Sequence, residues 1–294
     1  MKKNNDKKNA AKPAVKTKKK KTATDYLINL LLVCFSCVFL YSGYQLGTSL
    51  YESYSAKRTY EDLNNLVNND PVEPDVPDDT PAKGNDVLST AGYFLVESKY
   101  NSKGILKKYE SLYNQNKDMF GWLTIGGSRI NYPVMFAPKN IEFYLHRDFY
   151  KKYSANGTLY VDESYDPDNN IIIVYGHNMN DGSMFHDLMY YRNRSFYNQH
   201  PTFEFDFVSQ ENTYEVIGAF YSQIYSADAE NVFRFYNYTN LSREKTYNYF
   251  VSQVKKASLY STAASAKFGE QLVMFIICSD RSTGRFVVVA KRIY

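Results

Sequence analysis

The chain has 294 residues, 44% hydrophobic and 22% charged, which supports a packed core and excludes a wholly disordered protein. Its formal charge of +4 is uneven: ten Lys and two Asp within residues 1–25 give +8 and leave −4 for residues 26–294. The folded part is therefore acidic, which excludes nucleic acid as a partner. The 29 Tyr and 19 Phe favour half-buried β structure.

The first predicted element is an uncharged, apolar segment from Tyr26 to Tyr51. About 20 apolar residues span a hydrocarbon core of ~30 Å, and this segment is longer than the apolar region of a cleavable signal peptide. We therefore predict an uncleaved transmembrane anchor over residues 26–48, which contains Cys34 and Cys37. The lysines Lys18–Lys21 before it predict a cytoplasmic N-terminus, with residues 1–25 as a basic tail. The protein is then a single-pass cell-membrane protein with its C-terminal part outside.

A juxtamembrane segment and stalk are predicted over residues 49–92. Residues 49–66 carry mixed charges and can continue the helix out of the membrane. The stretch Asn68–Asp86 combines four prolines with six acidic residues, so it cannot bury a core and is expected to be extended. The folded extracytoplasmic domain is expected over residues 93–294.

Eight strand signals follow a helical pattern around Leu106–Tyr113. They cover Trp122–Ile125, Ile130–Met135, Thr158–Val161, Ile171–Tyr175, Thr202–Phe207, Tyr214–Tyr221, Leu272–Ile277 and Phe286–Lys291. Two further helices are predicted, one opening at Ser183 and one from Ser242. We predict a mainly β fold, an eight-stranded closed or nearly closed barrel with helical decorations.

Cys278 ends an apolar strand and precedes a polar turn, so substrate can approach it. A lone cysteine is often a small core residue. Against that, Cys278 is the only thiol outside the predicted anchor, and Arg281 and Arg285 follow it closely. Because positive charge stabilises a thiolate, Cys278 is a candidate nucleophile.

His177 follows another apolar strand and Gly176, which is expected to bend the chain out of the sheet. A single histidine is commonly structural, but an imidazole at a strand end can serve a thiol as acid and base. Of the other histidines, His146 and His200 lack this placement, and His186 on the predicted helix is the strongest rival.

No cofactor or metal site is predicted. The acidic turn Asp166-x-Asp168-x-Asn170 resembles the start of a calcium loop, but Ile171 replaces the glycine of position six and His177 the glutamate of position twelve. A solvated loop is the simpler interpretation.

One motif resembles a known family. The string Tyr175–Phe185 (YGHNMNDGSMF) is similar to the histidine motif of the sortases, and its NM followed by GSMF resembles class B. Further similar pieces appear in the family's order: Trp122–Ile125 (WLTI), Asn131–Val134 (NYPV), His200-Pro201, and Cys278 with Arg285–Val288 (RFVV). The resemblance covers residues from about 105 to 294.

The resemblance implies a sortase β-barrel and a membrane-anchored cysteine transpeptidase of Gram-positive bacteria, requiring no metal or cofactor. Such an enzyme cleaves a C-terminal sorting signal of a secreted protein through a thioester and joins it to a peptidoglycan amine or a pilin lysine. By the same resemblance Cys278 is the nucleophile, His177 the general acid and base, and Arg285 the group that positions substrate and supports the oxyanion.

Alternatives stay open at this stage. Arg281 is a rival for the role of Arg285, because the turn after Cys278 is short for the family. Ile276-Ile277 precede Cys278 where sortases carry small polar residues, which leaves the preferred sorting sequence and the other substrate-binding residues undetermined. A cell-wall cysteine peptidase would use the same residues with water as acceptor, and a stalked β domain binding wall glycans would need none of them.

Overall fold

The computed structural model describes residues 22–68, 98–278 and 284–294. The chain divides into two compact units, Met1–Leu50 and Tyr51–Tyr294. Helix α1 (Ala23–Asn68) includes the apolar segment, and its stretch Tyr26–Asn68 is long and apolar enough to cross a membrane. The predicted basic tail and the Pro-rich stalk lie almost wholly outside the described residues.

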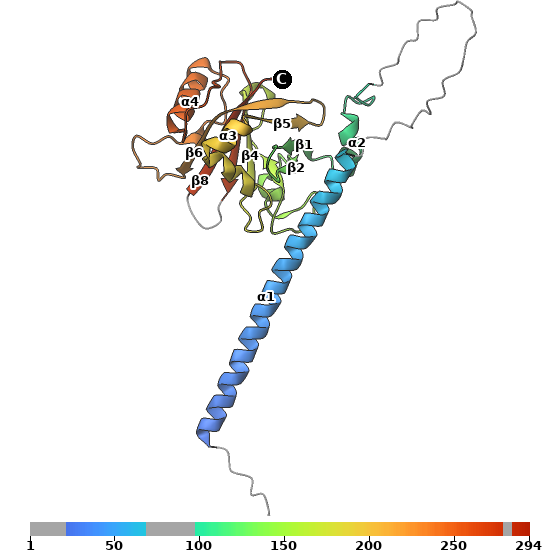
Figure 1. Cartoon of the computed structure of the whole chain (residues 1–294), viewed down its shortest axis with the longest axis vertical. Helices are drawn as coiled ribbons and strands as arrows, with labels where there is room; N and C mark the ends of the chain where they lie inside the picture. The colour runs from blue at the N-terminus through green and yellow to red at the C-terminus, as the bar shows by residue number, and fades with distance from the viewer. Residues whose placement is uncertain (1–21, 69–97, 279–283) are drawn as a thin grey trace, which may run out of the picture. The chain divides into compact units, whose positions relative to one another are not determined.

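The second unit is built on a closed eight-stranded barrel (Figure 1). The strands run around it in the order β1-β2-β3-β4-β7-β8-β6-β5, and β5 pairs with β1 to close it. Their bounds are β1 Met119–Thr124, β2 Asn131–Met135, β3 Leu159–Val161, β4 Ile171–His177, β5 Thr202–Phe207, β6 Thr213–Gln223, β7 Leu272–Cys278 and β8 Gly284–Arg292. All eight predicted strands are present, and the predicted fold class is confirmed.

The continuous apolar runs of β4 and β7 have a structural cause. In β4, Ile172 and Val174 face the main core of the barrel, whereas Ile171 and Ile173 belong to a second buried cluster outside it. Strand β7 alternates between the same two clusters. Because both faces of these strands are covered, they need no polar alternation.

Helix α4 (Glu244–Ala257) covers the outer cluster beside β6 (Figure 1). Its buried face consists of the residues predicted for it, Tyr247, Phe250, Val251 and Val254. Helix α2 (Lys107–Gln115) matches the predicted pattern near Leu106–Tyr113 and buries Tyr109 and Leu112. Short 3-10 helices lie between strands: η1 Ile141–His146, η2 Pro167–Asn169 and η4 Phe235–Asn237.

The helix predicted to open at Ser183 is wrong in position and type. The structure has a 3-10 helix, η3 (His186–Arg192), followed by the short α3 (Arg194–Gln199). Gly182 and Met184 have φ values of +83° and +55°, in the left-handed region. A right-handed helix cannot pass through such residues, so it starts only after them.

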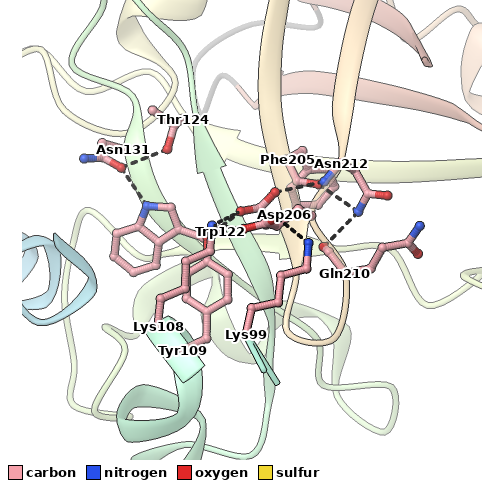
Figure 2. Close-up of polar contacts among 11 residues, drawn as sticks. Lys99, Lys108, Tyr109, Trp122, Thr124, Asn131, Phe205, Asp206, Gln210 and Asn212 are labelled. Atoms are coloured by element: carbon pink, nitrogen blue, oxygen red, sulfur yellow. Dashed lines mark hydrogen bonds and ion pairs between the residues drawn. The ribbon is translucent and has the colours of Figure 1, made fainter. Parts of the chain in front are cut away.

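A buried polar network fixes α2 to β5 (Figure 2). The Asp206 side chain is 6% exposed, and its carboxylate accepts hydrogen bonds from Lys108 Nζ and Tyr109 Oη, both at 2.8 Å, and from the Asn212 backbone N–H at 2.9 Å. Every buried carboxylate oxygen here has a donor, which offsets its desolvation. The network therefore stabilises the α2 side of the barrel.

Candidate active site

The predicted histidine and cysteine end two neighbouring parallel strands. Strands β4 and β7 pair in register from Ile171 with Leu272 to His177 with Cys278. Neighbouring strands are about 4.8 Å apart. The backbones of His177 and Cys278 therefore lie side by side at one edge of the barrel, although 100 residues of sequence separate them.

The sequence led us to expect a bend out of the sheet at Gly176, and this expectation is wrong. Gly176 stays within β4 and pairs with Ile277. A Cβ at this position would overlap the side chains of Leu159 and Phe185. Gly176 therefore allows Leu159 and Phe185 to pack closely against the strand. The parallel pairing with β7 continues through Gly176 to His177.

Arg285 begins the next strand around the barrel. It is half-buried at the start of β8, one residue before Phe286, which pairs with Ile277. Its Nη1 donates to the Gly284 carbonyl oxygen at 2.9 Å. All three predicted site residues thus lie at the same end of the adjacent strands β4, β7 and β8. The rival Arg281 and the side chain of Cys278 lie outside what the structure describes.

The His177 imidazole is 5% exposed and lies against η1. Its Nε2 is 2.8 Å from the Leu145 carbonyl oxygen. Because a carbonyl only accepts, Nε2 carries a proton there, and in neutral imidazole the lone pair is then on Nδ1. The carbonyl selects one tautomer and restricts rotation of the ring.

The neighbouring His146 was passed over in the sequence because it follows no strand. Its ring nevertheless stacks on that of His177, with centroids 5.6 Å apart and planes at 24°. His146 is exposed, so its ring covers the buried imidazole of His177 on the solvent side. Only the fold of η1 against β4 brings these two histidines together, and no local pattern indicated it.

A tight loop, residues 178–186, follows His177. The Phe185 N–H donates back to the His177 carbonyl oxygen at 2.8 Å. The Asp181 carboxylate accepts from the Ser183 N–H at 2.9 Å, and the buried Asn156 side chain donates to Ser183 Oγ at 2.9 Å. Burial would raise the pKa of Asp181, but hydrogen bonds to its carboxylate from the Ser183 hydroxyl and N–H and from the Asn156 side chain outweigh it and lower the pKa.

Arg129 holds this loop from the turn between β1 and β2. Its Nη2 and Nε donate to the two carboxylate oxygens of Asp187 at 2.7 and 3.0 Å, and its Nη1 lies 3.4 Å from the Asp181 carbonyl oxygen. Asp187 is 2% exposed. Burial would raise its pKa, but the hydrogen bonds and charge of Arg129 hold the pKa below the usual range. A Cβ on Gly182 would overlap the guanidinium, and its φ of +83° also favours glycine there.

The acidic turn is engaged in local hydrogen bonds. Asp166 Oδ1 accepts from the Asp168 N–H, and Asp162 Oδ1 from the Ser164 N–H, both at 2.9 Å. Within the described ranges no group of three His, Cys, Asp or Glu side chains is placed to hold a metal ion.

Comparison with known proteins gives a consistent result. No family model matches the chain. It is 26% identical over 261 residues to sortase B of Listeria monocytogenes, covering 86% of this chain and 92% of that protein. It is 29% identical over 217 residues to sortase B of Staphylococcus aureus, covering 70% and 85%.

Solved structures of sortase B share the fold. A crystal structure of sortase B from Bacillus anthracis in complex with AAEK1 superposes with a TM-score of 0.64 at 24% identity, covering 83% of this chain and 98% of that one. The S. aureus sortase B crystal structure at 2.0 Å gives 0.56 at 29% identity, covering 63% and 86%.

The closed barrel and these relatives define the class of the protein: it is a sortase, an enzyme with transpeptidase function. Both curated relatives and the solved structures are class B sortases. The protein is accordingly a class B-like sortase.

Proposed function

We propose that the protein is a membrane-anchored cysteine transpeptidase in which Cys278, His177 and Arg285 carry out the chemistry. The observation that supports this most directly is the parallel register of His177 with Cys278, beside the start of the strand that carries Arg285. A nucleophile and its acid-base partner must be held within reach of one scissile bond, and adjacent strand ends provide that.

The reaction proceeds in two halves. The Cys278 thiol passes its proton to His177, the resulting thiolate attacks the scissile carbonyl, and His177 gives that proton to the departing amine as the C–N bond breaks and the thioester forms. An incoming amine then attacks the thioester, gives a proton to His177 and releases Cys278 as thiolate. Since Nε2 of His177 is engaged with the Leu145 carbonyl, Nδ1 is the nitrogen that transfers the proton in each half.

Arg285 serves the oxyanion that forms in both halves. Its guanidinium is permanently charged and offers several donors, and a half-buried position strengthens their effect on developing negative charge. It also supports the thiolate form of the nucleophile through its positive charge.

The substrates are secreted proteins with a C-terminal sorting signal. S. aureus sortase B has been solved in a substrate complex, and a sortase B has been solved in complex with triglycine. By analogy, the acyl acceptor of this enzyme is an amine of peptidoglycan, or a lysine of a pilin subunit. Membrane anchoring through residues 26–48 would bring the domain of residues 93–294 to substrates emerging from the cell.

The test is a library of fluorogenic peptides with varied sorting signals, incubated with the full chain in detergent, with and without triglycine. We expect cleavage of a narrow set of peptides and, with triglycine, a product whose mass corresponds to transfer. The variants Cys278→Ala and His177→Ala should lose cleavage by at least about 10³-fold. Only wild-type enzyme should accumulate a peptide thioester, detected by intact mass.

His186→Ala serves as the matched control, because His186 is the rival histidine and lies at the start of η3. It should retain activity within about tenfold. Wild-type turnover in Cys278→Ala would contradict the enzymatic assignment of this residue, and product masses showing only hydrolysis with triglycine present would favour the peptidase.

A further inference from the structure

Tyr60, on the last turns of α1, connects that helix to the chain segment 144–158. The side chain is 4% exposed, and its Oη donates to the Gly157 carbonyl oxygen at 2.7 Å. The same oxygen lies 3.1 Å from Thr158 Oγ1, which donates to the Arg147 carbonyl oxygen at 2.8 Å. Burial raises the pKa of Tyr60, so its hydroxyl stays protonated and remains a donor.

Gly157 in turn lies directly against the backbone of η1. Its φ is +58°, and a Cβ here would overlap the carbonyl oxygens of Leu145 and Tyr144. The Thr158 N–H also donates to the Tyr144 carbonyl oxygen at 3.0 Å. Since the two backbones lie too close for a side chain to fit between them, we expect a shift of Gly157 to shift the Leu145 carbonyl.

The Leu145 carbonyl is the group that binds His177 Nε2 at 2.8 Å. The contacts therefore run from the Tyr60 hydroxyl to Gly157, from Gly157 to the Leu145 carbonyl, and from there to the imidazole. Each step is a hydrogen bond or direct backbone contact between described residues of the Tyr51–Tyr294 unit.

We propose that Tyr60 is a positioning residue for the reaction: it fixes the backbone carbonyl that orients His177. The proposal rests on the proposed acid-base role of His177. It makes the end of α1 part of the catalytic apparatus, although Tyr60 itself touches no reacting atom.

The position of Tyr60 in its helix adds to the argument. Ala56, Tyr60 and Leu63 form the buried face of α1 in this unit, and the ring of Tyr60 meets Tyr132 edge-on with centroids 5.2 Å apart. The ring packs against Tyr132, whereas the hydroxyl forms the hydrogen bond to Gly157, so the side chain makes two distinct contributions. Tyr60→Phe separates the two contributions, because it keeps the ring and removes only the hydroxyl.

The experiment compares wild type with Tyr60→Phe as full chains in proteoliposomes. A displacement of catalytic groups by a fraction of an ångström lowers the rate of the chemical step. With the best peptide of the library we therefore expect kcat to fall about tenfold and KM to stay within about twofold. In parallel, solid-state NMR of chains labelled with ¹⁵N at their four histidines reports the His177 ring nitrogens, assigned with His177→Gln. The Nε2 resonance should shift in Tyr60→Phe.

Tyr247→Phe is the matched control. Tyr247 is also fully buried, and its Oη donates to the Glu270 carbonyl oxygen at 2.8 Å, near the start of β7 and so at the opposite end from Cys278. It loses the same kind of hydrogen bond at similar cost in stability, and kcat and the His177 resonances should stay as in wild type. Thr158→Val removes the hydroxyl that lies beside Tyr60 Oη. It should also lower kcat and shift the Nε2 resonance of His177. This second variant keeps the proposal testable if Tyr60→Phe does not fold.

Wild-type kcat in Tyr60→Phe, or a lower kcat with unmoved His177 resonances, overturns the proposal. Equal effects in Tyr60→Phe and Tyr247→Phe also overturn it, because they indicate general destabilisation. If His177→Ala keeps wild-type kcat, the proposed function fails, and the NMR comparison still decides whether Tyr60 sets the hydrogen bond of the imidazole.

Discussion

The imidazole of His177 is held on two sides by consecutive residues of η1. The Leu145 carbonyl meets its edge at 2.8 Å, and the His146 ring stacks on its face at 5.6 Å between centroids. In the acid-base role proposed for His177, such confinement lowers the entropy lost when the ring aligns with a reacting bond. The conformational entropy of the ring is therefore lost during folding and not again at each turnover.

Arg285→Ala tests the arginine role at the same scale. Loss of an oxyanion donor typically costs 10²–10³-fold, so we expect kcat to fall by about that factor. Arg281→Ala should lose less than about tenfold, and Arg292→Ala, at the far end of β8, should resemble wild type. Steady-state peptide cleavage measures all three. A larger loss in Arg281→Ala than in Arg285→Ala would transfer the role to Arg281.

Among the elements, the loop of residues 178–186 is the one most closely tied to His177. It is closed by the backbone bond from Phe185 to His177 and held by Arg129 through Asp187. Asp187 is almost fully buried, so its carboxylate depends on the guanidinium. The ion pair therefore anchors the end of the loop to the turn between β1 and β2.

Arg129→Met leaves the Asp187 carboxylate buried without its cation. At pH 7 we expect the free energy of unfolding to fall by about 2 kcal/mol, less than for a fully buried pair because Arg129 is half-exposed. In wild type the pKa of Asp187 lies below its unfolded value near 4, so the stabilisation is present above that pH and is lost as the pH falls below it. The difference between variant and wild type should therefore shrink towards pH 3.

Urea unfolding of the full chain in detergent, followed by the fluorescence of the single tryptophan, Trp122, measures this difference at pH 7 and pH 3. Lys57→Met is the control, since Lys57 pairs with Glu61 on the exposed surface of α1 and should behave as wild type. A pH-independent difference in Arg129→Met would show that the ion pair is not its origin.

At the scale of the whole molecule, the chain joins a helix suited to a membrane with an enzyme domain. The apolar side chains at the start of α1 are exposed, as for Leu30 and Leu31, which is costly in water and favourable in lipid. The lysines before the helix favour the cytoplasmic side for the N-terminus.

Impermeant thiol labelling of intact cells tests this orientation. In a chain with Cys34, Cys37 and Cys278 changed to Ala, a cysteine replacing exposed Asp228 should be labelled without lysis. A cysteine replacing Lys8 in the basic tail should be labelled only after lysis. The reverse pattern would show that the predicted orientation is inverted.

Much of the fold was predictable because its signals are local. The alternation in Thr202–Phe207 and the doubly covered runs of β4 and β7 depend on side chains adjacent in sequence. The helix expected at Ser183 was wrong because left-handed backbone at Gly182 and Met184 overrides a favourable cap, and neither residue type requires that conformation.

The sequence alone determined the eight strands, the apolar helix and the candidate pair of Cys278 and His177, because periodicity, charge and strand ends depend only on residues that are neighbours in the chain. Only the tertiary structure decided that β4 and β7 lie parallel in register, that His146 stacks on His177, and that Tyr60 and Arg129 form hydrogen bonds to Gly157 and Asp187. These contacts join residues far apart in the chain, and which partners meet depends on how the barrel closes.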